Sequence, residues 1–309
     1  MFKYSNTNKR YHTFSYELKQ LFNKKIVKIS LDASLSCPNI DGKKGFGGCT
    51  YCSEFGSGDF VIEKQSDIKT QLEKGIEKSK SKHSNAQYIA YFQAHSNTYA
   101  PLKTLKNLFE TALNFDGIVG LSIATRADCL EDDVLEYLSE LNKRTYLVVE
   151  LGLQTIFDKT AENINRCHTY AEFIIGFEKL KKLNIKTCIH IINGLPYETA
   201  DMMLETAKAI NSLNPYSIKI HSLHILKNTR LALQFAKENF DMLNLSNYVN
   251  IVCDQIELIN PEIVIERITG DGDKANLVAP LWSANKLNVM NSIDKELAKR
   301  DSYQGKFCV

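Results

Sequence analysis

Six short apolar runs alternate with amphipathic stretches along this 309-residue chain, and this alternation restricts the possible fold more than any other feature. Each run is almost continuously apolar and β-branched, as is typical of parallel strands buried on both faces. The predicted strands are Ile26–Ala33, Tyr88–Phe92, Gly117–Ile123, Thr145–Leu151, Lys186–Ile192 and Ser217–Leu223. The predicted helices are Asp67–Lys80, Leu102–Leu113, Asp132–Leu141, Tyr170–Leu183 and Thr199–Leu213. This order predicts βαβ units with right-handed crossovers.

Six units are fewer than the eight that close a full barrel. The sequence therefore predicts an α/β fold, a partial (β/α)6 TIM-like barrel with a C-terminal α/β extension. We expect a basic N-terminal segment at 1–25, the partial barrel at 26–235, and the extension, packed on the barrel, at 236–309. In the extension the pattern predicts a helix at Asn244–Ile259, a short strand at Ile263–Ile268 and a final helix at Ser283–Leu297.

The composition predicts a globular protein of the reducing cytoplasm. Hydrophobic residues make up 44% of the chain and charged residues 24%, which are ordinary values for a folded enzyme. No apolar run approaches the length of a membrane span, and the polar, basic N-terminus does not resemble a signal peptide. The eight cysteines are scattered, so we expect free thiols rather than a disulfide framework.

Three of the cysteines, Cys37, Cys49 and Cys52, lie in one glycine-rich loop directly after the first predicted strand. In a parallel barrel this loop lies at the carboxyl ends of the strands, where the chemistry of such folds is found. Three thiolates can hold three irons of a [4Fe–4S] cube and leave the fourth iron open to a small molecule. We therefore predict that these three cysteines are the metal ligands.

Other readings of the loop remain open at this point. A structural zinc site usually has four Cys or His ligands, but the next such residue after Cys52 is His83, about a helix further along. A thioredoxin-like pair of Cys49 and Cys52 would leave Cys37 and the glycines without a role. A non-catalytic iron–sulfur or zinc protein is the third possibility.

Polar residues follow all six predicted strands. Burying polar groups without partners is costly, so this repetition is difficult to explain by packing and predicts a polar site at the carboxyl edge of the sheet. Single histidines such as His190, His221 and His224 are more often hydrogen-bonded core residues than catalysts. The polar segments are Gln93–Thr98, Thr125–Asp128, Glu150–Gln154, Asn165–His168, Asn193–Glu198 and Lys219–His224.

The N-terminal segment is basic. Residues 1–29 carry seven Lys or Arg against one acid, Glu17, with aromatic residues interleaved. Such a segment can contact nucleic acid, with Lys24, Lys25 and Lys28 as candidate phosphate contacts. It can equally be a solvated amphipathic helix, Tyr16–Asn23, that caps one end of the barrel.

The chain resembles the radical S-adenosylmethionine (SAM) superfamily. Within it, the chain is similar to the bacterial YhcC/YtqA-like subgroup, which is related to the radical SAM domain of the Elongator catalytic subunit. The matching motifs are Asp32-Ala33-x-x-x-x-Cys37-Pro38-Asn39-x-Asp41-Gly42, Gly47-Gly48-Cys49-Thr50-Tyr51-Cys52, Ala90-Tyr91-Phe92-Gln93-Ala94, Val149-Glu150-Leu151-Gly152-Leu153-Gln154 and Gly194-Leu195-Pro196-x-Glu198. The eleven residues between Cys37 and Cys49 are a long spacing for the superfamily, and the subgroup shares it.

The resemblance implies two cofactors, a [4Fe–4S] cluster and SAM, and an electron donor such as flavodoxin or ferredoxin. It places Tyr51 near the adenine and Glu150 near the ribose of SAM. Ile192 and Gly194 correspond to a conserved Ile-x-Gly pattern of the family. The segment from Gln93 replaces the usual glycine-glycine-glutamate that binds the SAM amine.

The resemblance also implies the reaction. The family cleaves SAM to a 5′-deoxyadenosyl radical, which removes hydrogen from an unactivated carbon. The Elongator-like relationship implies a tRNA substrate at the C5 side chain of the wobble uridine, and specifically the conversion of carboxymethylaminomethyl-uridine to aminomethyl-uridine. A small metabolite or a peptide is the alternative substrate. No residue is assigned as catalytic at this stage.

Overall fold

The computed structural model describes residues 2–54, 56, 61–62, 66–238, 240–270, 272 and 274–308. Its centre is a curved parallel sheet of seven strands in the order β1-β2-β3-β4-β5-β6-β8. The strands are β1 (Ile26–Leu31), β2 (Gln87–Phe92), β3 (Ile118–Thr125), β4 (Tyr146–Gln154), β5 (Lys186–Asn193), β6 (Ser217–Ser222) and β8 (Val264–Arg267). A separate antiparallel pair consists of β7 (Ile225–Leu226) and β9 (Leu277–Ala279).

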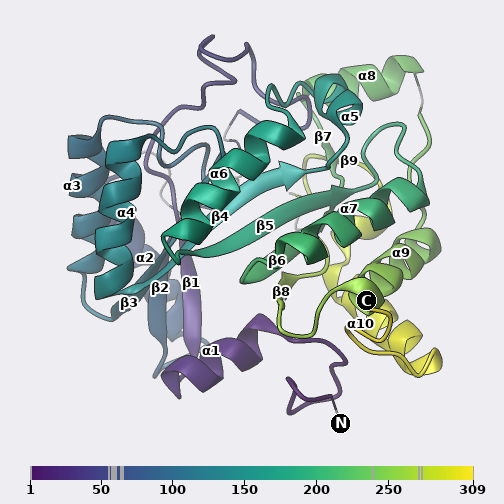
Figure 1. Ribbon diagram of the computed structural model, residues 1–309, viewed down its shortest axis with the longest axis horizontal. Helices are drawn as coiled ribbons and strands as arrows, with labels where there is room; N and C mark the ends of the chain where they lie inside the picture. Colours follow the sequence, from purple (N-terminus) through teal and green to yellow (C-terminus); the bar gives the residue numbers. More distant parts are fainter. Residues whose placement is uncertain are drawn as a thin grey trace.

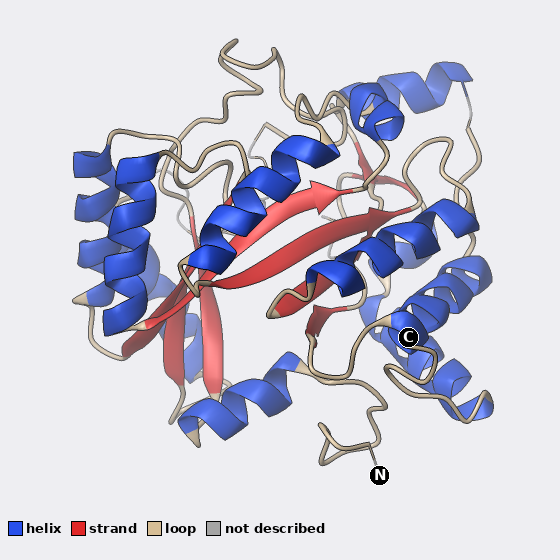
Figure 2. Cartoon of the chain, viewed as in Figure 1, coloured by secondary structure: helices blue, strands red, loops and turns tan. Residues whose placement is uncertain are grey.

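Helices cover the outer face of the curved sheet, as Figure 2 shows. In Figure 1, α6 and α7 cross in front of β4 and β5, and α3 and α4 stand side by side at the left. The helices are α1 (Phe14–Phe22), α2 (Ile68–Lys80), α3 (Leu102–Leu113), α4 (Asp132–Arg144), α5 (Asp158–Asn163), α6 (Tyr170–Lys182), α7 (Ala200–Leu213), α8 (Arg230–Glu238), α9 (Leu245–Leu258) and α10 (Lys286–Lys299), with a 3-10 turn η1 (Leu281–Ala284). None of the helices in the described ranges is long and apolar enough to span a membrane.

Apolar packing between the sheet and these helices forms the main core. Phe92 on β2 and Phe109 on α3 are fully buried, with their rings edge to face at 4.9 Å. Six helices, α1, α2, α6, α7, α9 and α10, begin where a side chain accepts a hydrogen bond from a backbone N–H of the first turn. Thr169 and Glu172 form a reciprocal capping box at the start of α6. The strand-to-helix alternation is thus supported both by burial and by local capping.

The predicted fold class is confirmed, with one addition to the sheet. All six predicted strands form and pair in parallel, and α3 matches its predicted bounds. The short strand expected in the extension becomes β8, which pairs in parallel with β6 as a seventh strand. The sequence analysis did not predict α5, α8 or the β7–β9 pair, which are short elements of two to nine residues.

The N-terminal segment packs against the C-terminal part of the chain. The Ile265 N–H donates to the His12 carbonyl at 2.8 Å, and the Gln304 N–H donates to the Arg10 carbonyl at 2.9 Å. Helix α1 packs against β1 and β8. In Figure 1 it lies at the bottom, at the opposite end of β1 from the long loop that follows this strand. This arrangement agrees with the barrel-capping interpretation of α1.

The cations of this segment have acidic partners within the protein. Lys3 lies 3.4 Å from Glu262, and Arg10 lies 3.0 Å from Asp301. Lys9 pairs with Asp294. Lys24 and Lys25 are exposed, but the expectation that Lys28 can contact phosphates is wrong. Its side chain is 16% exposed and its ammonium group pairs with two carboxylates inside the sheet, because β1 turns it to the concave face.

Candidate active site

A cavity of about 270 Å³ opens at the carboxyl ends of the strands. The cysteine loop contributes Cys37, Cys49 and Cys52 to its wall, and β2 to β6 and β8 each contribute side chains. Side chains from the middle of the strands, such as Glu150 and Lys219, lie deeper than the loop that follows β1. The cavity therefore has a thiol-bearing rim and a charged floor.

Backbone and amide contacts hold the cysteine loop over the cavity. The Gly48 N–H donates to the Asn39 carbonyl at 2.8 Å, and the Asn165 side-chain amide donates to the Gly48 carbonyl at 2.8 Å. Gly47 and Gly48 have φ angles of 72° and 73°, which side chains with a Cβ rarely adopt. These two glycines let the chain turn sharply before Cys49.

Cys49 has the most polar surroundings of the three thiols. Asn39 Nδ2 lies 3.6 Å and Arg166 Nη1 lies 3.8 Å from its sulfur. A hydrogen bond from the Cys52 thiol is the largest influence on the pKa of Cys49 and lowers it; burial opposes this, but the Arg166 charge helps to hold the pKa well below its usual range. Cys49 is therefore set up as a thiolate, the form that binds metal.

The donor set fits a cluster held by three cysteines. Among the residues that the structure describes, the cavity wall holds these three cysteines and no other. Two buried polar atoms nearby, Gln154 Oε1 and Thr50 Oγ1, have no hydrogen-bond partner among the described residues, so they keep the capacity to bond to a ligand. Cys129, Cys188 and Cys253 are buried elsewhere, and burial raises the pKa of each.

A buried ion network forms the floor of the cavity, centred on Glu150. Its carboxylate accepts from Lys28 Nζ at 2.7 Å and pairs with Lys219 Nζ. Burial acts to raise the pKa of Glu150, but the ammonium groups of Lys219 and Lys28 outweigh it and hold this pKa well below its usual range. The other donors to the same carboxylate are Tyr91 OH at 2.9 Å, Ser122 Oγ at 2.5 Å and His190 Nε2 at 2.7 Å.

Glu266 extends this network to the far edge of the sheet. It accepts from Lys28 Nζ at 2.8 Å and from Ser217 Oγ at 2.8 Å, and lies 3.7 Å from Lys219 Nζ. Two carboxylates and two ammonium groups thus balance one another in the interior. Side chains from all seven strands of the parallel sheet, including Tyr91 on β2 and Ser122 on β3, meet in one connected set of contacts.

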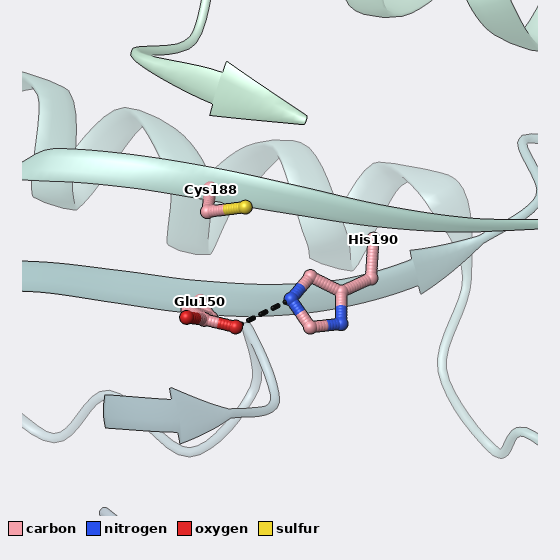
Figure 3. A group of neighbouring side chains, drawn as sticks. All are labelled: Glu150, Cys188 and His190. Carbon is pink, nitrogen blue, oxygen red and sulfur yellow. Dashed lines mark hydrogen bonds and ion pairs between the residues drawn. The ribbon is translucent and has the colours of Figure 1, made fainter. Parts of the chain in front are cut away.

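Glu150, Cys188 and His190 bring three metal-ligating atoms within 4.8 Å of one another (Figure 3). A cation is nevertheless disfavoured there, because two ammonium groups already contact the Glu150 carboxylate. Like charges at this separation in a buried site repel strongly. We therefore interpret this group as part of the ion network, with the His190 ring oriented by Glu150.

The structure brings most of the expected SAM-binding residues to one cavity. Tyr51, Gln93, Glu150 and Ile192 all line it. Gly194 is not among the lining residues, and its left-handed φ of 86° instead makes the turn after β5. The roles of these residues toward SAM remain predictions.

Several of the predicted strand-end polar residues hold the rim rather than facing a ligand. Asn97 Nδ2 donates to the carbonyls of Phe92, Ala94 and Ala124. Arg126 forms a two-pronged ion pair with Asp128, with N–O distances of 2.8 and 2.9 Å. The polarity at the strand ends therefore serves both the cavity and the loops that frame it.

Sequence reasoning missed Lys28 and Glu266 as site residues. Lys28 is the one charged residue of the mostly apolar β1, which was the signal that could have identified it, whereas Glu266 lies beside Arg267 in the four-residue β8. Arg166 was noted only as part of a polar strand end, although its side chain contacts the sulfur of Cys49.

Comparisons with known proteins agree with this geometry. The family model of the radical SAM superfamily matches residues 44–210, and that of the radical SAM C-terminal domain matches residues 215–299. Protein YtqA of Bacillus subtilis (strain 168) is 51% identical, over 99% of this chain and 95% of its own length. The predicted resemblance to this superfamily and to YtqA is confirmed.

Two further similarities are partial. A tRNA uridine(34) acetyltransferase of Methanocaldococcus jannaschii is 31% identical over 37% of this chain and 21% of its own length. The solved structure of the archaeal Methanocaldococcus infernus Elp3 aligns with a TM-score of 0.68 at 15% identity, over 91% of this chain and 64% of that one. At this identity the structural likeness supports the fold alone.

The cysteine assignment predicts the outcome of thiol removal. Protein reconstituted without oxygen should hold about four irons per chain, as expected for one [4Fe–4S] centre. Replacing Cys37, Cys49 or Cys52 by Ala should abolish this iron content and the cluster absorbance. Replacing Cys129, Cys167, Cys188, Cys253 or Cys308 by Ala should leave the iron content unchanged. A need for two of these five would contradict the assignment.

The ion network predicts an unequal effect of two neighbouring lysines. Lys28→Ala leaves two buried carboxylates short of one cation, which should lower the free energy of unfolding by roughly 3–5 kcal/mol. Lys25→Ala, at an exposed position three residues earlier, should change it by less than about 0.5 kcal/mol. Urea unfolding curves measure both, and equal effects would contradict the buried role of Lys28.

Proposed function

The chain belongs to the radical SAM superfamily, whose members use a [4Fe–4S] cluster and SAM, and we propose that it modifies the C5 side chain of the wobble uridine of tRNA. The observation that carries the proposal is the similarity to a protein named as a tRNA uridine(34) acetyltransferase. We further propose that flavodoxin or ferredoxin supplies the electron and that the reaction takes place in the cytoplasm.

The specific reaction proposed is the conversion of carboxymethylaminomethyl-uridine to aminomethyl-uridine. Oxidation of the carbon beside the side-chain nitrogen gives an imine, and water hydrolyses it to the amine and glyoxylate. This oxidation removes two electrons and two protons from the substrate. SAM would be the net two-electron acceptor, since its cleavage to methionine and 5′-deoxyadenosine takes up two electrons and one proton, and the other proton is released. The electron from the protein donor would start this cleavage and be returned when the substrate loses its second electron, so that it is not consumed.

The chain's own residues bind the reactants and accept this proton. Arg166 at the rim forms no ion pair with a carboxylate among the described residues, so its charge suits the carboxylates of SAM and of the proposed substrate. Tyr51 lies beside the thiols, in the position proposed for the adenine. Glu150 is the proposed ribose contact, and the five groups that donate to it fix its carboxylate in one orientation.

His190 is the residue best placed to take the proton. Burial and the neighbouring Lys219 lower the pKa of His190, so its ring is neutral near pH 7. The Glu150 carboxylate can only accept, so His190 Nε2 carries the hydrogen of their 2.7 Å bond. Its Nδ1 therefore has a free lone pair and no hydrogen-bond partner in the described part of the chain. A neutral imidazole oriented by a carboxylate is a suitable general base.

A second candidate substrate is a small metabolite or a peptide. The observation that favours it is the pairing of the N-terminal cations with acids at the end of the sheet away from the cavity. Several cations of the segment expected to contact RNA therefore have partners within the protein, although Lys24 and Lys25 stay exposed. Binding of a small substrate would depend only weakly on salt, whereas RNA binding would weaken steeply as salt increases.

Nucleoside mass spectrometry of tRNA tests the proposed substrate. A strain that lacks this protein should accumulate carboxymethylaminomethyl-uridine at position 34 and lose aminomethyl-uridine. The purified, reduced protein with SAM should reverse this in tRNA from that strain and release one glyoxylate for each 5′-deoxyadenosine. If the protein still cleaves SAM but the nucleosides of tRNA are unchanged in both experiments, tRNA is excluded as the substrate and the small-substrate candidate is favoured.

The proposed role of His190 predicts that its replacement lowers formation of the modified nucleoside but not formation of 5′-deoxyadenosine. His190→Gln keeps a hydrogen-bond donor toward Glu150 but removes the base, so product formation should fall about 100-fold or more. Formation of 5′-deoxyadenosine should persist, since the cysteine loop is untouched. His83→Gln, at an exposed surface position, should behave as the parent protein. Full product yield from His190→Gln would show that another group takes the proton.

A further inference from the structure

Two side-chain N–H groups point at one of the three ligand sulfurs. Arg166 Nη1 and Asn39 Nδ2 reach Cys49 at 3.8 and 3.6 Å. No side-chain N–H group within the described ranges contacts the sulfur of Cys37 or Cys52 in this way. The surroundings of the three thiols are therefore unequal, with a cation and an amide gathered at Cys49.

Other parts of the barrel hold both donors in place. Arg166 Nη2 donates to the Gly152 carbonyl at the end of β4, at 2.5 Å. The Arg166 carbonyl accepts from Arg126 Nη1 at 2.8 Å, and Asp128 anchors Arg126. Asn39 is fully buried, and its amide also donates to the Asn165 carbonyl at 2.5 Å. Arg166 is only 6% exposed, so neither donor is a mobile surface group.

Hydrogen-bond donors stabilise an iron–sulfur cluster by an amount that depends on the charge of the cluster. Adding an electron makes the cluster and its thiolates more negative, and hydrogen bonds to the sulfurs stabilise the added charge. A buried guanidinium does the same more strongly, because little water is present to screen it.

We propose that Arg166 and Asn39 raise the reduction potential of the cluster through their contacts with Cys49. The effect is directed at the iron that Cys49 binds. Arg126 and Gly152, at the ends of β3 and β4, hold Arg166 in place. Through Arg166 they therefore influence how readily a protein electron donor reduces the cluster. Arg166 is thus a positioning and tuning residue rather than a cluster ligand.

A nearby arginine provides a matched control. Arg230 contacts the same loop, because its Nη2 donates to the Gly48 carbonyl, but the structure gives it no contact with a sulfur. Arg166→Gln and Arg230→Gln each remove one cation that contacts a backbone carbonyl at the rim. Only Arg166→Gln also removes a donor to Cys49. Arg166→Lys keeps the charge while losing the planar fork.

The experiment is a potentiometric titration of the reconstituted protein, followed by electron paramagnetic resonance without SAM or substrate. At a fixed potential, Arg166→Gln should lower the ratio of reduced to oxidised cluster about tenfold, which is ~59 mV for one electron. Arg166→Lys should lower it less, in the same direction. Arg230→Gln should stay within about twofold of the parent protein.

Three outcomes would overturn the proposal. The first is an unchanged ratio in Arg166→Gln. The second is an equal fall in Arg230→Gln, which would assign the effect to the overall charge of the loop. The third is loss of the cluster in both Arg166 variants, which would make Arg166 a residue of cluster assembly. None of these outcomes depends on the tRNA substrate, since the titration contains none.

Discussion

The buried ion network around Glu150 is the interaction on which the rest of the structure depends. The sheet is open, since β1 and β8 are its two edges and do not pair with each other. Lys28 on β1 nevertheless contacts both Glu150 on β4 and Glu266 on β8. An ion pair in the interior is expensive unless all its members are matched. Here two ammonium groups balance two carboxylates, so the curvature that lets these strands meet is required by charge as well as by packing.

This network also determines where a ligand can lie. It fills the lower part of the barrel interior and leaves space above, at the carboxyl ends of the strands. The cysteine loop covers that space from one side, and Asn39, Asn165 and Arg230 fix it to other elements. The long spacing between Cys37 and Cys49 provides the residues that make these contacts. The loop is therefore a folded part of the cavity wall, and its length serves its attachment.

Local patterns in the sequence predicted most of the strands and helices, and they drew attention to three thiols that line one cavity in the structure. The apolar runs marked each strand within a few residues, because burial on both faces leaves a continuous signal. Cys37, Cys49 and Cys52 were identifiable because all three are close in sequence. A strand at the position of β8 was expected as well, but nothing in its four residues indicated that it would extend the parallel sheet. Pairing between β6 and β8 depends on a contact across more than forty residues of chain, which periodicity cannot reveal.

Contacts between distant residues explain what the sequence could not show. The sequence analysis assigned Lys28 to a basic surface, because its partners Glu150 and Glu266 are 122 and 238 residues away along the chain. Arg10 read in the same way, yet it pairs with Asp301. The N-terminal cations thus help to join the two ends of the chain, and a count of charge along the sequence does not separate such pairing from binding to RNA.

The two ends of the barrel consequently have different roles, one in stability and the other in ligand binding. At the amino ends of the strands, ion pairs and α1 fasten the terminal segments across the opening of the sheet. At the carboxyl ends, the charged groups lie around a cavity, where Arg166 faces a thiol and His190 keeps one ring nitrogen without a partner among the described residues. Polar groups whose hydrogen bonds are all made within the protein stabilise the fold, whereas polar groups that can form a further hydrogen bond are available to a ligand. The same balance explains why Glu150, although central to the floor, acts first as the residue that orients His190 and Lys219.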